Sequence, residues 1–395
     1  MSYLVQDVME YVEREDVKFI RLAFCDVYGN LKNASIMPDR LEDAFKNGIS
    51  FDGSAINGFQ GIEKSDLFLF PDPATLTLLP WRPSHGRVIR LFCDIKNPDG
   101  TPYNADSRNI LKNAIEKAKQ KGIEFNFGTE FEFYLFKLDE NGNKTNEPCD
   151  NAGYMDVAPK DKGENVRREI CLTIEEMGLT PECSHHEEGP GQNEIDFMYS
   201  DALSSADHAV IFKNATQSIA NKNGFYASFE PKPLENKSGS GLHVNVSLNG
   251  VEESVTDNFV AGVLKRIKDI TCFLNPTEQS YLRLGELKAP NTISWARENR
   301  STLVRIPATK GKKRFELRSP DGQANVYIAY ALIIYAGLEG IENKSVLPEE
   351  NIGNAFENSS LEKLPQDLKS ARKLAFESSF IKKYLPTEII NSLKD

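Results

Sequence analysis

The chain of 395 residues is long enough for several domains, or for one large domain beside a small one, and it can bury a sizeable core. Its composition is that of a globular protein, with 40% hydrophobic and 27% charged residues. The formal net charge of −11 argues against nucleic acid or an anionic membrane surface as the main partner, because both attract basic patches. The negative charge is more typical of a protein that binds small molecules together with metal cations.

The cysteines and the apolar segments favour a cytoplasmic protein. The six cysteines are scattered and form no CxxC pair, so the sequence indicates neither a disulfide framework nor a zinc knuckle. The first residues, MSYLVQDVMEYVERED, carry acids where a signal peptide has an apolar run. The longest apolar run, YIAYALIIYAGL at 327–338, is too short to cross a bilayer, and we expect it to form a buried core helix.

The first part of the chain predicts a small sheet with a helix. From about residue 16 to 103, short β-branched or aromatic runs such as VKFIRLAF and RVIRLFCDI alternate with turn signals. One helical stretch, PDRLEDAFKNG, interrupts them. The Pro, Gly, Asn and Asp residues of NPDGTPYNADS mark a boundary, so we expect domains at 1–103 and 104–395.

The rest of the chain predicts helices with strands between them. Apolar residues at helical spacing indicate a helix over 107–122, closed by Gly122. Similar patterns favour helices at 164–177, 203–222, 257–273 and 323–342. The sequence contains no internal repeat.

Four of the predicted strands carry polar residues at every second position. Side chains two apart on a strand share a face, so each strand has one polar and one apolar face. The polar sets are Glu130 and Glu132 in FNFGTEFEFYLF; Gln192, Glu194 and Asp196 in GQNEIDF; His243, Asn245 and Ser247 in LHVNVSL; and Arg314, Glu316 and Arg318 in RFELRS. Taken singly, each strand is more typical of a solvated outer face.

Taken together, these polar faces favour binding of metal and phosphate. If they converge with Glu187, which lies in SHHEEGPGQNE, the carboxylates could not all stay ionised without cations, because crowded carboxylates raise one another's pKa. A carboxylate-rich set with a single imidazole favours Mg²⁺ or Mn²⁺ over zinc. The adjacent pair His185 and His186 is by itself more typical of a structural role than of a ligand.

Arginines supply the positive complement of the predicted site. Arg300 and Arg305 lie in ENRSTLVRIP, and guanidinium groups suit phosphate and carboxylate recognition. The sequence has no GxxxxGK[ST] loop and no GxGxxG after a strand. A bound nucleotide would therefore be held by metals and arginines rather than by a P-loop.

With these segments in view, the chain resembles glutamine synthetase of the bacterial type I group over nearly its whole length. The matching stretches, in family order, are SFDGSAINGFQGIEKSDLFLFPD, GTEFEFYLF, AGYMDVAP, SHHEEGPGQNEIDF, PKPLENKSGSGLHVNVSL, ENRSTLVRIP and RFELRSPDGQANVYIAYALIIYAGLEGI. The resemblance implies an α+β fold with a small N-terminal β-grasp-like domain. It also implies a larger catalytic domain whose curved antiparallel sheet forms a funnel surrounded by helices, open to ATP at one end and to glutamate at the other.

The resemblance also implies the reaction and the residues that perform it. ATP would phosphorylate the γ-carboxylate of glutamate, and ammonia would then attack the acyl phosphate to give glutamine. One metal would be held by Glu132, Glu187 and Glu194, and the other by Glu130, His243 and Glu316. Glutamate would meet Glu132, Gly239, His243, Arg283 and Arg318; the nucleotide would meet Glu182, Asn245, Ser247 and Arg314; Arg300 and Arg305 would handle the transferred phosphate; and Asp52, Tyr154 and Glu187 would form the ammonium site.

The segment RLGELKAP at 283–290 departs from the family, which usually has RLVPGYEAP and a flap glutamate that takes a proton from ammonium. Lys288 occupies the position of that glutamate, and a protonated amine repels ammonium and cannot accept its proton. Glu286, two residues earlier in the shortened loop, could reach the same space if the flap is rebuilt. The alternative interpretation leaves both side chains on a solvated loop.

Three functions follow from these observations. ATP-dependent glutamine synthesis is favoured because all the metal-ligand positions are present. A γ-glutamyl ligase that uses another amine would explain the altered flap, although Asp52 and Tyr154 argue against it. A catalytically weak homologue that binds metabolites or a regulator would be expected to lose metal ligands, and none is lost.

The resemblance further implies a homo-oligomer with active sites between subunits, in which the neighbouring subunit supplies Asp52. Both a hexameric ring and a double ring stay open, because the sequence ends at YLPTEIINSLKD, short of the helical tail that joins two rings in many members. The expected partners are glutamate, ATP and ammonia, with neither nucleic acid nor a membrane among them.

Overall fold

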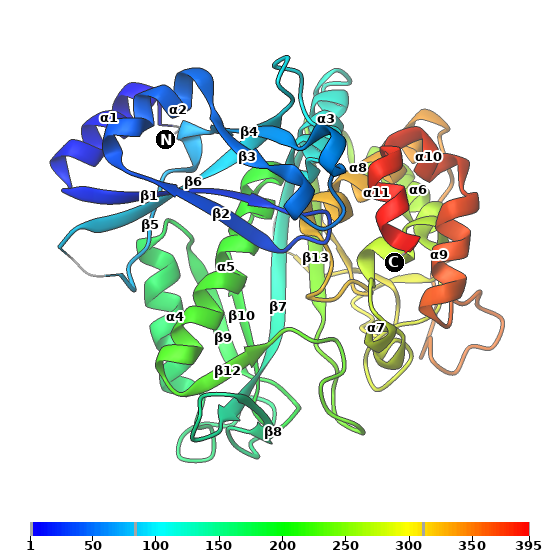
Figure 1. Ribbon diagram of the computed structural model, residues 1–395. Helices are drawn as coiled ribbons and strands as arrows, with labels where there is room; N and C mark the ends of the chain where they lie inside the picture. The colour runs from blue at the N-terminus through cyan, green and yellow to red at the C-terminus, as the bar shows by residue number, and fades with distance from the viewer. Residues whose placement is uncertain (1–2, 83–84, 310–312, 395) are drawn as a thin grey trace.

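Two sheets organise the chain in the computed structural model, which describes residues 3–82, 85–309 and 313–394. The smaller sheet is built from the first hundred residues and lies beside the upper end of the larger one (Figure 1). In the view of Figure 1, helices α4 and α5 lie to the left of β7, and α6 and α9 lie to its right. The mixed α+β fold expected from the sequence is confirmed.

The N-terminal sheet has the strand order β2-β1-β6-β4-β3, with β5 paired to β6. Strands β1 and β6 are parallel and the other pairs are antiparallel. Ile20 and Leu22 on β1 and Leu91 on β6 are fully buried, so one side of the sheet forms a core. The elements are α1 Val5–Arg14, β1 Val17–Cys25, β2 Leu31–Ile36, α2 Leu41–Asn47, β3 Ile49–Asp52, β4 Asp66–Pro71, β5 Thr77–Leu78 and β6 Arg87–Lys96, with short 3₁₀ turns at Pro38–Arg40, Gly53–Ala55, Ile62–Lys64 and Pro73–Thr75.

The larger sheet has the order β14-β15-β16-β13-β7-β10-β9, and β8, β11 and β12 also pair with β7. All its pairings are antiparallel except the one between β14 and β15. Strand β7 is central and runs through the height of the molecule (Figure 1). The strands are β7 Glu124–Leu138, β8 Lys144–Pro148, β9 Pro181–His186, β10 Gln192–Phe197, β11 Ser200–Asp201, β12 Phe225–Ser228, β13 Leu242–Asn249, β14 Trp295–Arg297, β15 Val304–Ile306 and β16 Phe315–Leu317.

Helices cover the apolar face of this sheet. Phe127 on β7 stacks on Tyr330 of α8 with ring centroids 4.3 Å apart, and Phe131 stacks on Phe212 of α5 at 5.2 Å. The opposite face of β7, which carries Glu130 and Glu132, is left uncovered by this core. The helices are α3 Ser107–Lys119, α4 Glu164–Glu176, α5 Ala202–Lys222, α6 Glu253–Leu274, α7 Glu278–Arg283, α8 Val326–Glu342, α9 Leu368–Glu377, α10 Ser379–Tyr384 and α11 Thr387–Asn391, with a final 3₁₀ turn at Ser392–Lys394.

A buried arginine joins the region of the smaller sheet to the larger one. Arg108 on α3 donates from Nε and Nη2 to the two carboxylate oxygens of Asp207 on α5, at 3.0 and 2.9 Å. The same guanidinium reaches Asp72 at 2.9 Å and Asp94 at 3.1 Å. Three carboxylates thus accept hydrogen bonds from one guanidinium group. A buried charge needs such partners, because burial without them is costly.

Each helix predicted from apolar spacing exists, with shifted ends. The largest shift is at 257–273, where α6 already starts at Glu253, and at 323–342 α8 starts only at Val326. The side chain of Asn325 accepts hydrogen bonds from the backbone of Tyr327 and Ile328, so it caps the helix and sets its first turn. The segment 327–338 is buried, as expected of a core helix.

Two further findings concern the cysteines and the long helices. All six cysteines are free. Within the described residues, no helix is both long enough and apolar enough to cross a membrane.

Candidate active site

The pairing of the strands brings the four polar faces together. His243 on β13 and Asp196 on β10 both lie opposite Glu130 of β7, on its two sides. Glu194 lies opposite Glu132, and Asn245 lies opposite Glu316 of β16. Because residues directly opposite each other in a ladder share a face, all these side chains project to the same side of the sheet.

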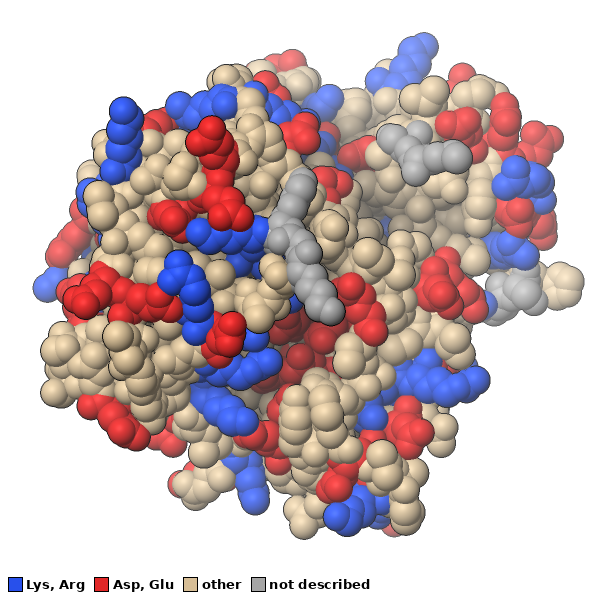
Figure 2. All heavy atoms as spheres, turned by 180° about the vertical axis from the view of Figure 1, so that it is seen from behind, with Lys and Arg blue, Asp and Glu red and all other residues tan. Residues whose placement is uncertain are grey.

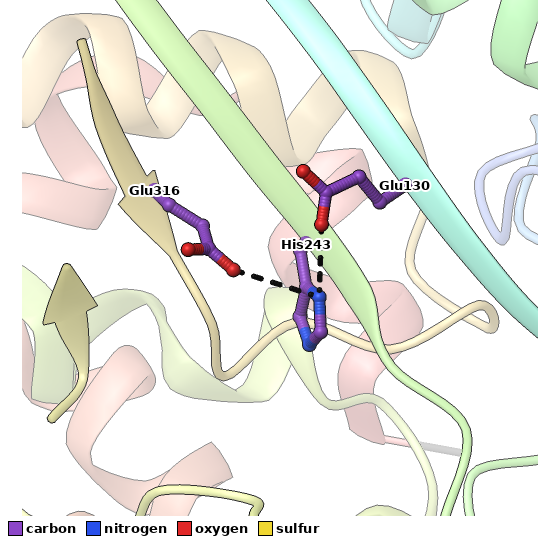
Figure 3. A group of neighbouring side chains, drawn as sticks. All are labelled: Glu130, His243 and Glu316. Atoms are coloured by element: carbon purple, nitrogen blue, oxygen red, sulfur yellow. Dashed lines mark hydrogen bonds and ion pairs between the residues drawn. The ribbon is translucent and has the colours of Figure 1, made fainter. Parts of the chain in front are cut away.

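One cluster consists of Glu130, His243 and Glu316 from three neighbouring strands (Figure 3). His243 Nδ1 lies 3.3 Å from Glu130 Oε2 and 3.6 Å from Glu316 Oε1. One ligand atom from each residue lies within 4.8 Å of the others. This spacing and chemistry suit one divalent cation with oxygen and imidazole ligands.

The pKa of Glu130 is set by two opposing effects. Burial raises the pKa of this carboxyl, but the hydrogen bond and charge of His243, together with the amide of Asn245 at 2.8 Å, lower it to about 2. Glu130 is therefore ionised at neutral pH and is available as a ligand.

Acidic groups on β9 and β10 form a second crowded region. His185, Glu187 and Glu194 each place a ligand atom within 4.8 Å of the others, and so do Glu130, Glu194 and Asp196. Burial, followed by repulsion from Glu132, raises the pKa of Glu187 to about 7 and that of Glu194 well above its usual range. Burial and then Glu130 raise the pKa of Asp196 to about 7. A divalent cation would relieve this repulsion.

Glu132 lies beside this second cluster with its carboxylate held by other partners. Its Oε2 accepts the backbone N–H of Gly241 at 2.7 Å, and Gln192 Nε2 lies 3.4 Å away. The set expected from the sequence grouped Glu132 with Glu187 and Glu194. In the structure Glu132 lies directly opposite Glu194 in the ladder, and His185 also places a ligand atom within 4.8 Å of those of Glu187 and Glu194. The expected set stays a prediction.

The arginines interlock with the acids around Glu316. Arg305 donates to Glu316 Oε2 at 2.7 Å, and Arg318 Nε lies 3.3 Å from Oε1. Arg318 also donates to the carbonyl of Arg300 at 2.6 Å. The buried Arg283 donates to the carbonyls of Ser319 and Arg318, at 2.8 and 3.2 Å, so it is fixed by backbone rather than by an acid.

These side chains line two connected cavities. A cavity of about 520 Å³ is lined by Glu130 and His243 of the first cluster, by the acids of the second region, and by Gly239, Arg283, Arg300, Arg305 and Arg318, whereas Glu316 is buried behind it. A second, of about 540 Å³, is lined by Glu182, Asn245, Ser247 and Arg314. Glu130, Asp196 and Arg314 line both, so the two cavities meet at these residues. Figure 2, from behind, shows a recessed acidic patch with Lys and Arg side chains beside it.

The shortened loop after α7 forms part of the rim of the first cavity. Glu286, Leu287 and Lys288 line it, and Lys288 forms an ion pair with Glu188. Backbone hydrogen bonds from Gly285 to Ala289 and from Ala289 to Glu286 close the loop, at 2.9 and 3.0 Å. Gly285 has φ +88°, and a Cβ there would lie 2.3 Å from Asn291 Nδ2, so the tight turn requires glycine.

Of the residues expected to bind ammonium, Tyr154 and Glu187 line the first cavity, whereas Asp52 lies elsewhere. Tyr154 is 53% exposed, and its ring centroid is 5.3 Å from that of His185. Asp52 ends β3 in the N-terminal sheet, where its carboxylate accepts hydrogen bonds from the backbone and the hydroxyl of Ser54 at 2.9 and 2.6 Å. Within one chain, the structure does not bring Asp52 to the other site residues.

The structure adds Gln192, Asp196, His185 and Glu188 to the residues expected at this site. The sequence predicts that Gln192 and Asp196 lie on the same polar strand face as Glu194, but it gives a role to Glu194 alone. His185 and His186 project to opposite faces of β9, because side chains alternate along a strand. His186 is buried and bonds Asp150 at 3.0 Å, whereas His185 faces the cavity.

Family comparisons cover the whole of this architecture. Residues 16–98 match the family model "Glutamine synthetase, beta-Grasp domain", and residues 104–394 match "Glutamine synthetase, catalytic domain". The small N-terminal sheet is therefore a β-grasp domain, as expected.

Curated relatives agree over nearly the full chain. Glutamine synthetase of Methanosarcina mazei is 45% identical, covering 98% of this chain and 91% of the relative. That of Clostridium saccharobutylicum is 44% identical, covering 97% and 92%, and that of Staphylococcus aureus is 42% identical, covering 99% and 93%.

Solved structures of the same fold include one described as "GmaS/ADP complex-Conformation 1", with a TM-score of 0.90 and 28% identity, and one described as "Apo GmaS without ligand", with 0.90 and 29%. Each alignment covers 98% of this chain and 94% of the other. On the strength of the two family models and of relatives that are 42 to 45% identical, this chain belongs to the glutamine synthetase family.

Proposed function

We propose that this protein is a glutamate–ammonia ligase, which forms L-glutamine from L-glutamate and ammonia with ATP, through a γ-glutamyl phosphate. The observation that carries the proposal is the meeting of two cavities at Glu130, Asp196 and Arg314, one lined by acids and arginines and the other by polar groups. Two substrates that enter from opposite sides can react at such a junction. Family membership at 42 to 45% identity supports this reaction.

Divalent cations fit the donor set of the site. Glu130, His243 and Glu316 would hold one ion, and Glu187 and Glu194, with Glu132 or His185, would hold the other. The raised pKa values of Glu187 and Glu194 support this assignment, since uncompensated carboxylates are crowded there. Mg²⁺ or Mn²⁺, when bound, would neutralise charge on the phosphate oxygens during transfer.

The side chains of the first cavity would position glutamate. Arg318 and Arg283 offer positive charge from fixed orientations, and Gly239 lines the same cavity. The carboxylates of Glu132 and the imidazole of His243 lie on the same face of the sheet. We place the nucleotide in the other cavity, near Glu182, Asn245, Ser247 and Arg314.

The chemistry proceeds in two steps. A γ-carboxylate oxygen of glutamate attacks the terminal phosphorus of ATP, and the bond to ADP breaks. The nitrogen of ammonia then attacks the acyl carbon, the C–O bond to phosphate breaks, and the nitrogen loses a proton. Arg300 and Arg305 would stabilise the charge on the transferred group, and Arg305 supports this role because its Nε is buried without a hydrogen-bond partner within the described residues.

We assign the proton acceptor of the second step to Glu286. It lines the same cavity as Tyr154 and Glu187, and its neighbour Lys288 is paired with Glu188. Pairing offsets the positive charge of Lys288, which otherwise would repel ammonium.

A second candidate function, favoured by Lys288 itself, is ligation of an organic amine to the γ-carboxyl of glutamate. A panel of amines separates the two functions: purified protein with Mg²⁺, ATP and glutamate should release phosphate when ammonium is added. Release with an organic amine alone would select the second function. No release with any amine, beside measurable ADP binding, would reject both and leave a binding protein.

We further propose a cytoplasmic homo-oligomer, either a hexameric ring or a double ring, with domains at 1–103 and 104–395. The position of Asp52 supports an assembly, because this residue lies outside the cavity of its own chain and a neighbouring subunit could supply it. Sedimentation velocity distinguishes a monomer from a ring. Asp52→Asn, mixed with a subunit inactive through another residue, should regain activity if sites are shared.

A further inference from the structure

A third cavity lies away from the active site, between the N-terminal sheet and helix α5. Its volume is about 430 Å³. Strands β1 and β6 form one wall through Arg21, Ala23 and Arg90, and α5 forms the facing wall through Lys213 and Asn214. No described residue lines both this cavity and either of the active-site cavities.

Arg90 is the unusual residue in this cavity. Arg90 is only 2% exposed, yet its Nε and Nη2 have no hydrogen-bond partner among the described residues. Its guanidinium lies over the ring of Phe92, 5.2 Å from the centroid, and Nη1 approaches Asn214 Oδ1 at 3.5 Å. Burial, which disfavours the charged form, lowers the pKa of this guanidinium to about 10, although Asp207 opposes the shift.

The two unpartnered nitrogens define what would fit against them. Arg108 uses the same pair, Nε and Nη2, to hold both oxygens of the Asp207 carboxylate at 3.0 and 2.9 Å. Arg266 directs the same pair at Glu339 Oε2, at 3.1 and 2.9 Å. Arg90 lines the cavity, and among the described residues no acid meets this edge, so Nε and Nη2 are left as two parallel donors for a group with two adjacent oxygens.

The charges around Arg90 also favour an anion. Arg21 lies directly opposite Arg90 in the β1–β6 ladder, so both guanidinium groups are on the same face of the sheet. Lys213 approaches from α5, where it donates to the carbonyl of Gly322 at 2.5 Å. The acid that lines the cavity, Glu230, is already paired with Lys144 at 2.8 Å.

We propose that this cavity is a binding site for a small oxyanion, a carboxylate or phosphate group held by the Nε–Nη2 edge of Arg90 with Arg21 and Lys213 around it. Because its walls come from the β-grasp domain and from α5 of the catalytic domain, the anion would tie the two domains together. The site is separate from the proposed ligase chemistry.

The test measures the unfolding temperature of the full-length protein, titrated with inorganic phosphate or with malonate at constant ionic strength. A ligand that binds only the folded protein raises this temperature with its concentration. In Arg90→Met, the anion affinity derived from the shift should fall about tenfold or more, because two charge-assisted hydrogen bonds are removed. Arg21→Gln should weaken it by a smaller factor.

Two control variants locate the effect. Arg87→Gln removes the same charge from the same strand, but Arg87 pairs with Glu15, and its response to anions should match the unaltered protein. Arg305→Gln alters the proposed phosphate site of the ligase and should keep the Arg90-dependent response.

Each arm decides the proposal. A response to phosphate alone assigns a phosphoryl ligand, and a response to malonate alone assigns a carboxylate. If neither anion stabilises the protein beyond a chloride control, or if Arg90→Met and Arg21→Gln respond as the unaltered protein does, the cavity is not an anion site. Because Arg90→Met removes an uncompensated buried charge, it should fold at least as stably without anion; if it does not, Arg21→Gln still decides the question.

Discussion

The candidate active site has two parts that are built differently. Its acidic walls are borne by strands β7, β10, β13 and β16, where backbone pairing fixes each side chain against its neighbours. Its rim at 284–289 is a loop held by a few backbone hydrogen bonds, with Glu286, Leu287 and Lys288 exposed.

The difference shows where the chain can change. A substitution on a strand face leaves a buried charge unpaired, whereas a shorter loop can be closed again by a glycine turn such as Gly285. Five of the six expected ligands lie on strands, and Glu187 lies in the connection between β9 and β10. The departure expected from the sequence is at the rim.

The largest expected effect is therefore on the strands. Glu316→Gln should reduce ligase turnover by about 100-fold or more, because Glu316 is fully buried and contacts His243, Arg305 and Arg318. Steady-state phosphate release measures the loss, with Glu140→Gln, in an exposed turn, as the matched control. Turnover within a few-fold of the unaltered protein would mean that the strand cluster is not the reaction centre.

The rim comes next. Glu286→Gln should lower turnover with ammonium by about tenfold to 100-fold, with a changed pH profile, because a general base contributes on that scale. If turnover and its pH profile do not change, Glu286 is a solvated loop residue, and the proton leaves through another group.

A smaller effect is expected at Lys288. Its ion pair with Glu188 is 65% exposed on the lysine side, so Lys288→Gln should change the free energy of unfolding by less than about 1 kcal/mol. A double-mutant cycle with Glu188→Gln measures the coupling, and ammonium turnover should change only a few-fold. A large gain in turnover for Lys288→Glu would show instead that the rim lacks its acid.

The last expected effect is on stability without metal rather than on turnover. The pKa values of Glu187 and Asp196 are raised by folding, so these groups stabilise the folded protein fully below their unfolded pKa, and that contribution is lost as pH rises toward about 7. In EDTA, the unfolding temperature should fall by about 3 °C across this window, and Mg²⁺ or Mn²⁺ should abolish the fall.

Glu187→Gln should reduce this dependence on pH, while Glu140→Gln should leave it unchanged. An unfolding temperature that rises with pH in EDTA would contradict the crowded-carboxylate explanation.

The sequence predicts the strand-borne part well because its signal is local. Alternation at period two separates Glu130 and Glu132 from Phe131 and Phe133, and the same rule orders β10, β13 and β16. Family membership and the β-grasp and catalytic folds were likewise expected from ordered motifs, and they are confirmed.

What the sequence misses depends on contacts between distant segments. Arg90 meets Asn214 across 124 residues, and no local pattern indicates that Arg90 lines a cavity. The placement of Glu132 depends on the N–H of Gly241, and the start of α8 depends on the cap by Asn325. Packing decides each of these, whereas periodicity does not.

Strand β7 is a single stretch of 15 residues, and it carries both Glu130 and Glu132 on its uncovered face. At about 3.3 Å per residue, their Cα atoms stand about 7 Å apart along a rigid ladder. The geometry of the strand thus fixes the distance between the two acidic clusters, whichever ligands they bind. One residue inserted between the two glutamates would turn one acid into the aromatic core. Evolution can therefore change the loop at the rim of the cavity far more easily than the spacing of Glu130 and Glu132.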